Sequence, residues 1–287
     1  MPIASRLAPR CRHDGLERDG PARGGGVADR RAVAVRDVGG GAGMTTQPCA
    51  LSVRDLTLAH RGRTALIGLN GRFEPGVATA VIGPNGAGKS SLLAALAGQL
   101  RPTAGQIERD PRSRIAYLPQ QTAFDRSFPV SVHDLVAMGL WPRLGAWRRI
   151  DASHRALIDA ALAQVGLADA ARRPVAELSA GQWQRALFAR LLLQDADVIL
   201  LDEPFNAVDE QTTTDLLALL AQWVAQGRTV IAVLHDLAQV RRHFDQTLIL
   251  SGQRCRAWGP TAEVLGTVEP SAAVAWLNPS APWLQAA

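Results

Sequence analysis

Lysine is nearly absent from this sequence of 287 residues: of its 31 basic residues, only Lys89 is a lysine and all the others are arginine. A coding bias can replace lysine with arginine at every position where either residue is functional. Under such a bias, a lysine remains only where an arginine would not function. A point-like ammonium fits among phosphate oxygens where a planar, forked guanidinium does not. The single lysine therefore marks the first candidate site.

Several other features are missing as well. The three cysteines (Cys11, Cys49 and Cys255) are scattered, which excludes a disulfide framework and a cysteine metal site and suits a reducing compartment. No run of 18 apolar residues is free of charge, and the first residues lack the apolar segment of a secretory signal, so we expect neither a membrane span nor export. Residues 1–43 carry +3 of the net charge of +5, so the rest of the chain lacks the basic excess of a nucleic-acid binder.

Residues 1–43 differ from the rest in composition. They are rich in arginine, glycine and alanine, include two Gly-Gly-Gly runs and show no sustained hydrophobic periodicity. Such a segment cannot bury enough apolar surface to order itself. We predict a disordered extension here, with Met44 as the natural start; a genuine disordered tail is the alternative, and the mass of the natively expressed protein distinguishes the two.

A phosphate-binding loop is predicted after the apolar run 77–82. The loop has the pattern Gly, four residues, Gly-Lys-Ser, and it opens into a helical segment at 92–97. Its glycines let successive N–H groups turn towards a phosphate, and the helix N-terminus adds partial positive charge there. Lys89 is placed to reach the β- and γ-phosphates of a nucleotide, and the Ser90 hydroxyl to hold Mg²⁺. The predicted phosphate-binding residues are Gly83, Pro84, Asn85, Gly86, Ala87, Gly88, Lys89, Ser90 and Ser91.

The rest of the pattern predicts an α/β fold: a P-loop NTPase core with a mixed sheet flanked by helices, an antiparallel β piece and an inserted helical subdomain. Within the insert, Ser131 and Asp134 resemble a capping box, and 154–165 reads as an amphipathic helix that Gly166 ends. Apolar or alternating runs predict strands at 51–58, 66–73, 115–118, 197–201, 229–234 and 247–250. Helical spacing predicts helices at 181–194, 211–226 and 236–243.

Two adjacent carboxylates follow the predicted strand at 197–201. The carboxyl end of such a strand is where ligands bind in open α/β sheets. Asp202 suits the coordination or second shell of Mg²⁺ beside Ser90, and Glu203 suits a general base for water. A further motif opens the helix at 181–194 and can offer a hydroxyl and backbone N–H groups to an anion: Leu178, Ser179, Ala180, Gly181 and Gln182.

These motifs, in this order over about residues 50–265, resemble the nucleotide-binding subunits of ATP-binding cassette (ABC) transporters. The family signature reads Leu-Ser-Gly-Gly-Gln, whereas this chain has Ala180 at the third position. The resemblance implies an ATPase with ATP and Mg²⁺ as ligands. It also implies a homodimer that closes head to tail, so that the signature 178–182 of one copy meets the γ-phosphate held by the other.

The resemblance assigns roles to further residues. Gln120 matches a glutamine that senses the γ-phosphate and Mg²⁺, and His235 matches a histidine that contacts the γ-phosphate. Asn206 and Asp209 match the D-loop, which crosses the dimer interface. His60 stands where the family has an aromatic side chain stacked on adenine; a histidine can stack too, and a merely solvated side chain is the alternative. The catalytic set is therefore Glu203, His235 and Gln120, and the Mg²⁺ set is Ser90, Gln120 and Asp202.

The resemblance also implies a domain organisation and a set of partner proteins. The ATPase domain spans 44–265 with the helical insert at about 122–180, and 266–287 is a short tail. The apolar side chains of Phe128, Trp141 and Trp147 either border a groove for a cytoplasmic helix of a polytopic membrane permease or fill the core of the insert. A periplasmic or surface substrate-binding protein acts through the permease, no nucleic acid is involved, and the ATPase lies peripherally on the cytoplasmic face of the inner membrane.

The transported substrate is a finer inference. Residues 127–139 and 203–209 resemble zinc/manganese importer ATPases, while 141–145 also resembles iron-siderophore and cobalamin importers, which are the alternative. No residue is assigned to the transported metal. Soluble ABC ATPases that act on DNA or ribosomes carry a long coiled coil or a second cassette, and neither is present in this sequence. A nucleotide kinase or GTPase would lack the signature and His235.

Overall fold

The computed structural model describes residues 51–60, 62–120, 129–145, 149–206 and 208–266. The predicted extension 1–43 with its start at Met44, and residues 267–287 of the predicted tail, lie outside these segments and stay predictions. None of the described helices combines the length and the apolar character that crossing a bilayer requires.

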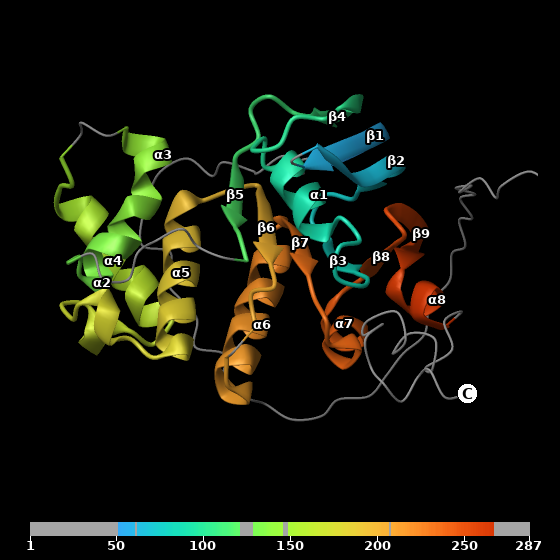
Figure 1. Cartoon of the computed structure of the whole chain (residues 1–287). Coiled ribbons are helices and arrows are strands. Elements are labelled where there is room, and N and C mark those ends of the chain that lie inside the picture. The colour runs from blue at the N-terminus through green and yellow to red at the C-terminus, as the bar shows by residue number, and fades with distance from the viewer. Residues whose placement is uncertain (1–50, 61, 121–128, 146–148, 207, 267–287) are drawn as a thin grey trace, which may run out of the picture. The chain divides into compact units, whose positions relative to one another are not determined.

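A six-stranded sheet carries the fold, in the order β5-β6-β7-β3-β8-β9 (Figure 1). The first five of these strands run parallel, and β9 pairs antiparallel with β8. Every residue of β3, β6 and β7 is buried, as expected for parallel strands covered on both faces. The predicted mixed sheet is confirmed; its strands are β3 (Ala78–Ile82), β5 (Ile115–Leu118), β6 (Val198–Asp202), β7 (Thr229–Val233), β8 (Gln246–Ser251) and β9 (Arg254–Pro260).

A smaller antiparallel sheet in the order β2-β1-β4 lies beside the first (Figure 1). The sequence predicted β1 (Leu51–His60) and β2 (Arg63–Phe73), but it did not predict β4 (Ala104–Arg109). The side chains of β4 are exposed or half-buried, so no apolar alternation marks the segment. Its backbone pairing with β1 makes it a strand.

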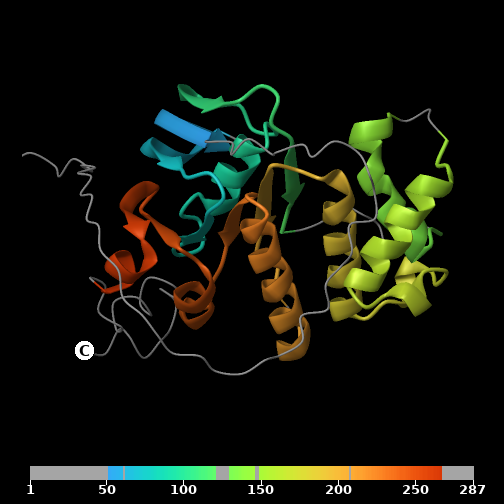
Figure 2. The ribbon, with the colours of Figure 1, turned by 180° about the vertical axis from the view of Figure 1, so that it is seen from behind.

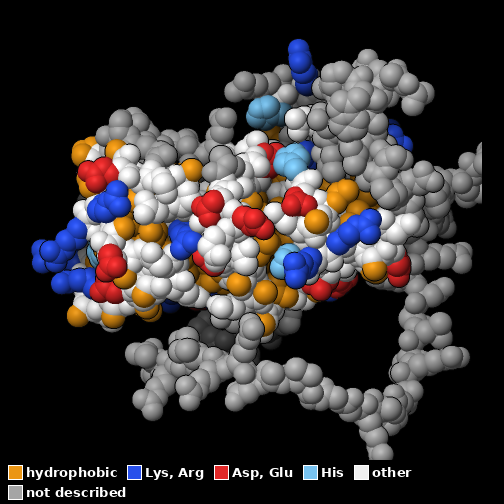
Figure 3. All heavy atoms as spheres, turned by 90° about the horizontal axis from the view of Figure 1, so that it is seen from below, with side chains coloured by type: hydrophobic (Ala, Val, Ile, Leu, Met, Phe, Trp, Pro, Cys, Tyr) orange, Lys and Arg blue, Asp and Glu red, His pale blue; other side chains and the backbone are white. Residues whose placement is uncertain are grey.

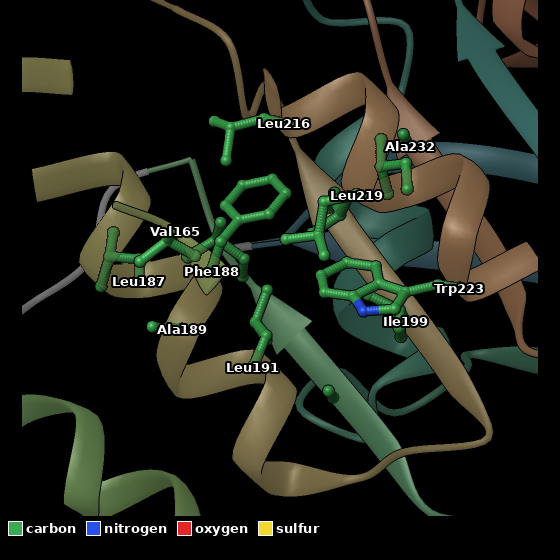
Figure 4. Close-up of a cluster of buried hydrophobic side chains, with 14 of the residues drawn as sticks. Val165, Leu187, Phe188, Ala189, Leu191, Ile199, Leu216, Leu219, Trp223 and Ala232 are labelled. Carbon is green, nitrogen blue, oxygen red and sulfur yellow. The ribbon is translucent and has the colours of Figure 1, made fainter. Parts of the chain in front are cut away.

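Two hydrophobic cores cover the two faces of the large sheet. On one face, Val198 and Leu200 of β6 pack with β1, β2 and α1 (Lys89–Leu96); on the other, Ile199 and Leu201 pack with helices α5 (Ala180–Gln194) and α6 (Glu210–Ala225). Figure 2 shows these layers from behind. In the second core Phe188 of α5 stacks on Trp223 of α6, with ring centroids 5.7 Å apart (Figure 4). Short helices α7 (Leu237–His243) and α8 (Thr261–Gly266) complete the end of the chain that is described.

Helices fill the described part of the predicted insert and pack against α5 (Figure 1). The capping box is confirmed: the Asp134 N–H donates to Ser131 Oγ at 3.1 Å, and the Ser131 N–H donates to Asp134 Oδ2 at 3.4 Å. The helix predicted at 154–165 begins two residues earlier, at Ala152, because Asp151 caps it by accepting from the His154 N–H at 3.0 Å. The helices are α2 (Val132–Ala137), α3 (Trp141–Leu144) and α4 (Ala152–Gln164), with a 3-10 turn at Met138–Leu140.

Candidate functional site

The predicted phosphate loop joins β3 to α1, and its glycines are required by close packing. A Cβ atom on Gly88 would lie 2.2 Å from the Ala65 carbonyl oxygen, and Gly88 has φ of 98°. A Cβ atom on Gly83 would lie 2.0 Å from the carbonyl oxygen of Leu250 in β8. Only glycine fits at both positions, so the loop is pressed between the two sheets at the start of α1.

Lys89 lies at the centre of this loop. Its Nζ donates hydrogen bonds to the carbonyl oxygens of Gly83 at 2.8 Å and Pro84 at 3.0 Å, and only 6% of the residue is exposed. Burial lowers the pKa of the Lys89 ammonium, while the nearby charges of Glu203 and Asp202 act in the opposite direction. The loop therefore curls around a buried cation that faces two carboxylates.

Asp202 ends β6 and is 2% exposed. Burial raises the pKa of its carboxyl group, and a hydrogen bond from the Ser90 side chain opposes that rise. Its Oδ1 atom is buried and has no hydrogen-bond partner among the residues that the structure describes. A buried carboxylate oxygen without a hydrogen-bond partner, next to a serine hydroxyl, provides oxygen ligands of the kind that a hard divalent cation binds.

Glu203 leaves β6 with φ of 52°, in the left-handed region, and its N–H donates to the Val233 carbonyl of β7 at 3.2 Å. Three side chains hold its carboxylate. Gln120 Nε2 donates to Glu203 Oε2 at 2.7 Å, Asn206 Nδ2 donates to the same oxygen, and His235 Nε2 lies 2.7 Å from Glu203 Oε1. The carboxylate side chain is only 9% exposed. The three predicted catalytic residues thus meet at one carboxylate.

A cavity of about 910 Å³ connects the loop to these side chains. Its lining includes Gln120, Glu203 and His235, and also His60 at the end of β1, which pairs with Arg63 of β2. The structure therefore brings His60 into the cavity of the phosphate loop. Sequence reasoning missed four lining residues: Arg63, Thr64, Ala65 and Gln253. Only Arg63 had a sequence signal, since it is a basic residue in the short connection between the predicted strands at 51–58 and 66–73.

The signature residues lie elsewhere. None of residues 178–182 is among the described residues that line this cavity. Ser179 caps α5: the Gln182 N–H donates to Ser179 Oγ at 3.2 Å, and Gln182 Oε1 accepts from the Ser179 N–H at 3.2 Å. Ser179 and Ala180 are exposed. An exposed, capped helix start that does not face the cavity of its own chain can meet an anion held by another molecule.

Asp209 of the predicted D-loop caps α6. The Thr212 N–H donates to Asp209 Oδ1 at 2.8 Å, and the Thr212 hydroxyl donates to Asp209 Oδ2 at 2.9 Å. These hydrogen bonds lower the pKa of the Asp209 carboxyl group. Across the described segments, no group of three or more His, Cys, Asp or Glu side chains is placed to hold a metal ion.

Comparison with known proteins identifies the family to which these motifs belong. The family model described as ABC transporter matches residues 66–206. The zinc transport system ATP-binding protein TroB of Treponema pallidum (strain Nichols) is 41% identical over 208 residues, which span 70% of this chain and 78% of that protein. The manganese transport system ATP-binding protein MntB of Bacillus subtilis (strain 168) is 38% identical over 221 residues, which span 75% of this chain and 88% of that protein.

Solved structures of ABC transporter proteins are also similar to this chain. One described as an inward-facing metal-chelate type ABC transporter is 33% identical, with a TM-score of 0.69 over 76% of this chain and 85% of that chain. An ATP-binding cassette of an ABC transporter in its ADP conformation is 20% identical, with a TM-score of 0.68 over 79% of this chain and 97% of that chain. The second likeness bears on the fold alone.

Proposed function

This chain belongs to the ABC transporter family, and from that premise we propose that it is the ATP-hydrolysing subunit of an importer for zinc or manganese. One observation carries the ATPase part of the proposal: Glu203, held by Gln120, Asn206 and His235, lines the same cavity as the phosphate loop. A carboxylate at that place can accept a proton from a water molecule that attacks a phosphate in the loop.

We assign the parts of the nucleotide site as follows. The loop 83–91 binds the phosphates, with Lys89 as the cation among them. Ser90, Asp202 and Gln120 hold Mg²⁺, which when bound neutralises charge that develops on the phosphates. The buried, unpartnered Asp202 Oδ1 supports this assignment within the part of the chain that the structure describes. His60, which lines the same cavity, stacks on the adenine.

We propose that the active form is a homodimer. The cavity is lined on one side by the loop and its partners, while the signature of the same chain lies outside it, with Ser179 exposed. Two copies arranged head to tail bring Ser179 and the N–H groups of α5 of one copy to the γ-phosphate held by the other. Asn206 and Asp209, which precede α6, then lie at the interface.

The insert supplies the surface for a membrane permease. Trp141 is 55% exposed and Leu157 is 45% exposed. Leu157 also lines a cavity of about 260 Å³, whose other lining residues are Leu140, Arg143, Leu144, Ser153 and His154. Exposed apolar side chains around a hollow are typical of a docking site. The other two predicted groove residues, Phe128 and Trp147, lie outside the described segments. We place the subunit peripherally on the cytoplasmic face of the inner membrane, where the permease brings cargo from an exported substrate-binding protein.

The substrate class rests on the relatives. Two of them are named for zinc and manganese transport. One observation supports the alternative, an iron-siderophore or cobalamin importer: the chain is 33% identical to a transporter described as metal-chelate type. The proposal assigns no residue of this chain to the cargo and no role in nucleic-acid binding. On the face seen in Figure 3, basic and acidic side chains lie interspersed.

Metal uptake by cells tests the proposal. A strain lacking this gene is complemented with the natural sequence or with Glu203→Gln, and uptake of radioactive zinc, manganese and iron chelate is followed. We expect the natural sequence to restore zinc or manganese uptake and Glu203→Gln to fail. Restoration of iron-chelate uptake alone would replace the substrate class, and unchanged uptake of all three in the deletion strain would overturn the transport role.

A further inference from the structure

Arg185 joins three separate segments of the chain. It lies on α5, one turn beyond Gly181 of the signature. Its Nη2 donates to Asp215 Oδ2 at 2.7 Å and to Thr212 Oγ1 at 3.2 Å, both on α6, and its Nη1 donates to the Val165 carbonyl oxygen at 3.4 Å, just after α4 of the insert. One guanidinium therefore ties the signature helix to α6 and to the insert.

The contacts continue to the D-loop. Thr212, which accepts from Arg185, donates its hydroxyl to Asp209 Oδ2 at 2.9 Å. A Cβ atom on Gly181 would lie 2.9 Å from Asp209 Oδ2 and 3.1 Å from Thr212 Oγ1, so the signature backbone lies directly against the same group. Arg185, Thr212, Asp209 and Gly181 thus form one cluster between the starts of α5 and α6.

The junction with the insert is otherwise incompletely packed. A cavity of about 370 Å³ lies beside Arg185, lined by the end of α4, the Val165–Gly166 turn and the Asp215–Leu219 side of α6. Figure 4 shows Val165 and Leu216 near this junction. Besides Arg185, a hydrogen bond between Gln164 and Gln222 at 3.2 Å spans the gap. These polar contacts add to the apolar packing of Val165, which belongs to the same hydrophobic core as Leu216. The rigid fork of an arginine suits three acceptors in different directions better than a lysine does.

We propose that Arg185 is a positioning residue, which holds the signature and Asp209 in one fixed arrangement so that both can meet the second copy together. The proposal rests on the proposed function, in which two copies pair around ATP. Arg185 is not among the residues that line the nucleotide cavity. Its loss should therefore weaken the pairing of two chains while leaving the ATP affinity of a single chain unchanged.

ATP-dependent pairing of the full chain tests this. Glu203→Gln, which slows hydrolysis, serves as the parent, and Arg185→Met is added to it. We expect the protein concentration for half-maximal pairing, measured by light scattering with saturating ATP, to rise about tenfold, which equals about 1.4 kcal/mol. ATP affinity of the single chain, measured by titration at low protein concentration, should stay within about twofold of the parent.

Matched variants keep the result interpretable. Arg54→Met removes an arginine from an exposed pair with Glu108 on the small sheet, at 3.3 Å, and should leave both measurements unchanged. Asp215→Asn removes the charge of the shortest Arg185 contact with little change of shape and should reproduce the pairing defect, so a folding failure of Arg185→Met does not stop the test. Arg185→Lys should restore pairing only in part.

The two proposals fail in different ways. Pairing of the Arg185→Met and Asp215→Asn variants equal to that of the parent would overturn the role of Arg185 alone. A loss of ATP affinity as large as the loss of pairing would also overturn it, because Arg185 would then act within its own chain. Absence of ATP-dependent pairing in the Glu203→Gln parent would overturn the homodimer of the proposed function itself.

Discussion

Replacement of Glu203 by glutamine separates the chemistry of the site from its shape. In the structure Glu203 Oε2 accepts from Gln120 and Asn206, and Oε1 lies against His235. The amide oxygen of a glutamine can take the place of Oε2 and accept from the same two donors. Its NH₂ group then faces His235 Nε2, which accepts when the ring is neutral and protonated on the other nitrogen. We therefore expect the loop, the cavity and the fold to stay intact.

The variant loses the proton acceptor. A positioned general base contributes about 10²- to 10⁴-fold to a rate, so the kcat of ATP hydrolysis should fall by at least about 10²-fold. ATP affinity should stay within about threefold, because Lys89 and the loop glycines are untouched. Phosphate release measures the rate, and equilibrium titration with ATP measures the affinity.

Glu108→Gln is the control, because it makes the same chemical change at a surface glutamate that pairs with Arg54 on the small sheet. It should leave both the rate and the affinity unaltered. If Glu203→Gln kept more than about a tenth of the natural kcat, proton transfer to this carboxylate would not limit hydrolysis, and the catalytic role of Glu203 would be wrong.

Three further changes test other parts of the structure. Lys89→Arg keeps the charge but forces a larger planar group between the Gly83 and Pro84 carbonyls, so ATP affinity should fall about tenfold or more by titration; equal affinity would contradict the need for an ammonium. His60→Tyr places a phenol ring where stacking on adenine is proposed and should raise ATP affinity several-fold, about 0.5–1.5 kcal/mol. Unchanged affinity would place the base elsewhere. Trp223→Ala removes a fully buried ring stacked on Phe188 and should lower the free energy of unfolding in urea by about 3–5 kcal/mol, whereas a loss below about 1 kcal/mol would contradict this packing.

The sequence predicted those parts of the fold whose patterns are local. The apolar run before the phosphate loop and the run before Asp202 are short and continuous, and both form central strands of the sheet. The Ser131–Asp134 capping box is likewise complete within four residues. In each case the residues that determine the structure are neighbours in the chain, so spacing alone reveals them.

The features that the sequence did not reveal depend on contacts between distant segments. β4 is a strand because it pairs with β1, and its own side chains carry no apolar alternation. Gln253 reaches the nucleotide cavity from the turn between β8 and β9, where its carbonyl accepts from the Ile67 N–H at 2.8 Å. These residues are known only once the sheets are assembled.

The burial of Lys89 also determines how the protein reacts with acylating reagents. The chain has one side-chain amine, which is 6% exposed and donates to two loop carbonyls. Outside this loop only the α-amino group can react, so lysine-directed labels leave the surface of the protein unmodified. A nucleotide analogue that carries an amine-reactive ester on its phosphate chain would therefore modify a single side chain. The extent of that modification would report the fraction of molecules whose nucleotide site is open.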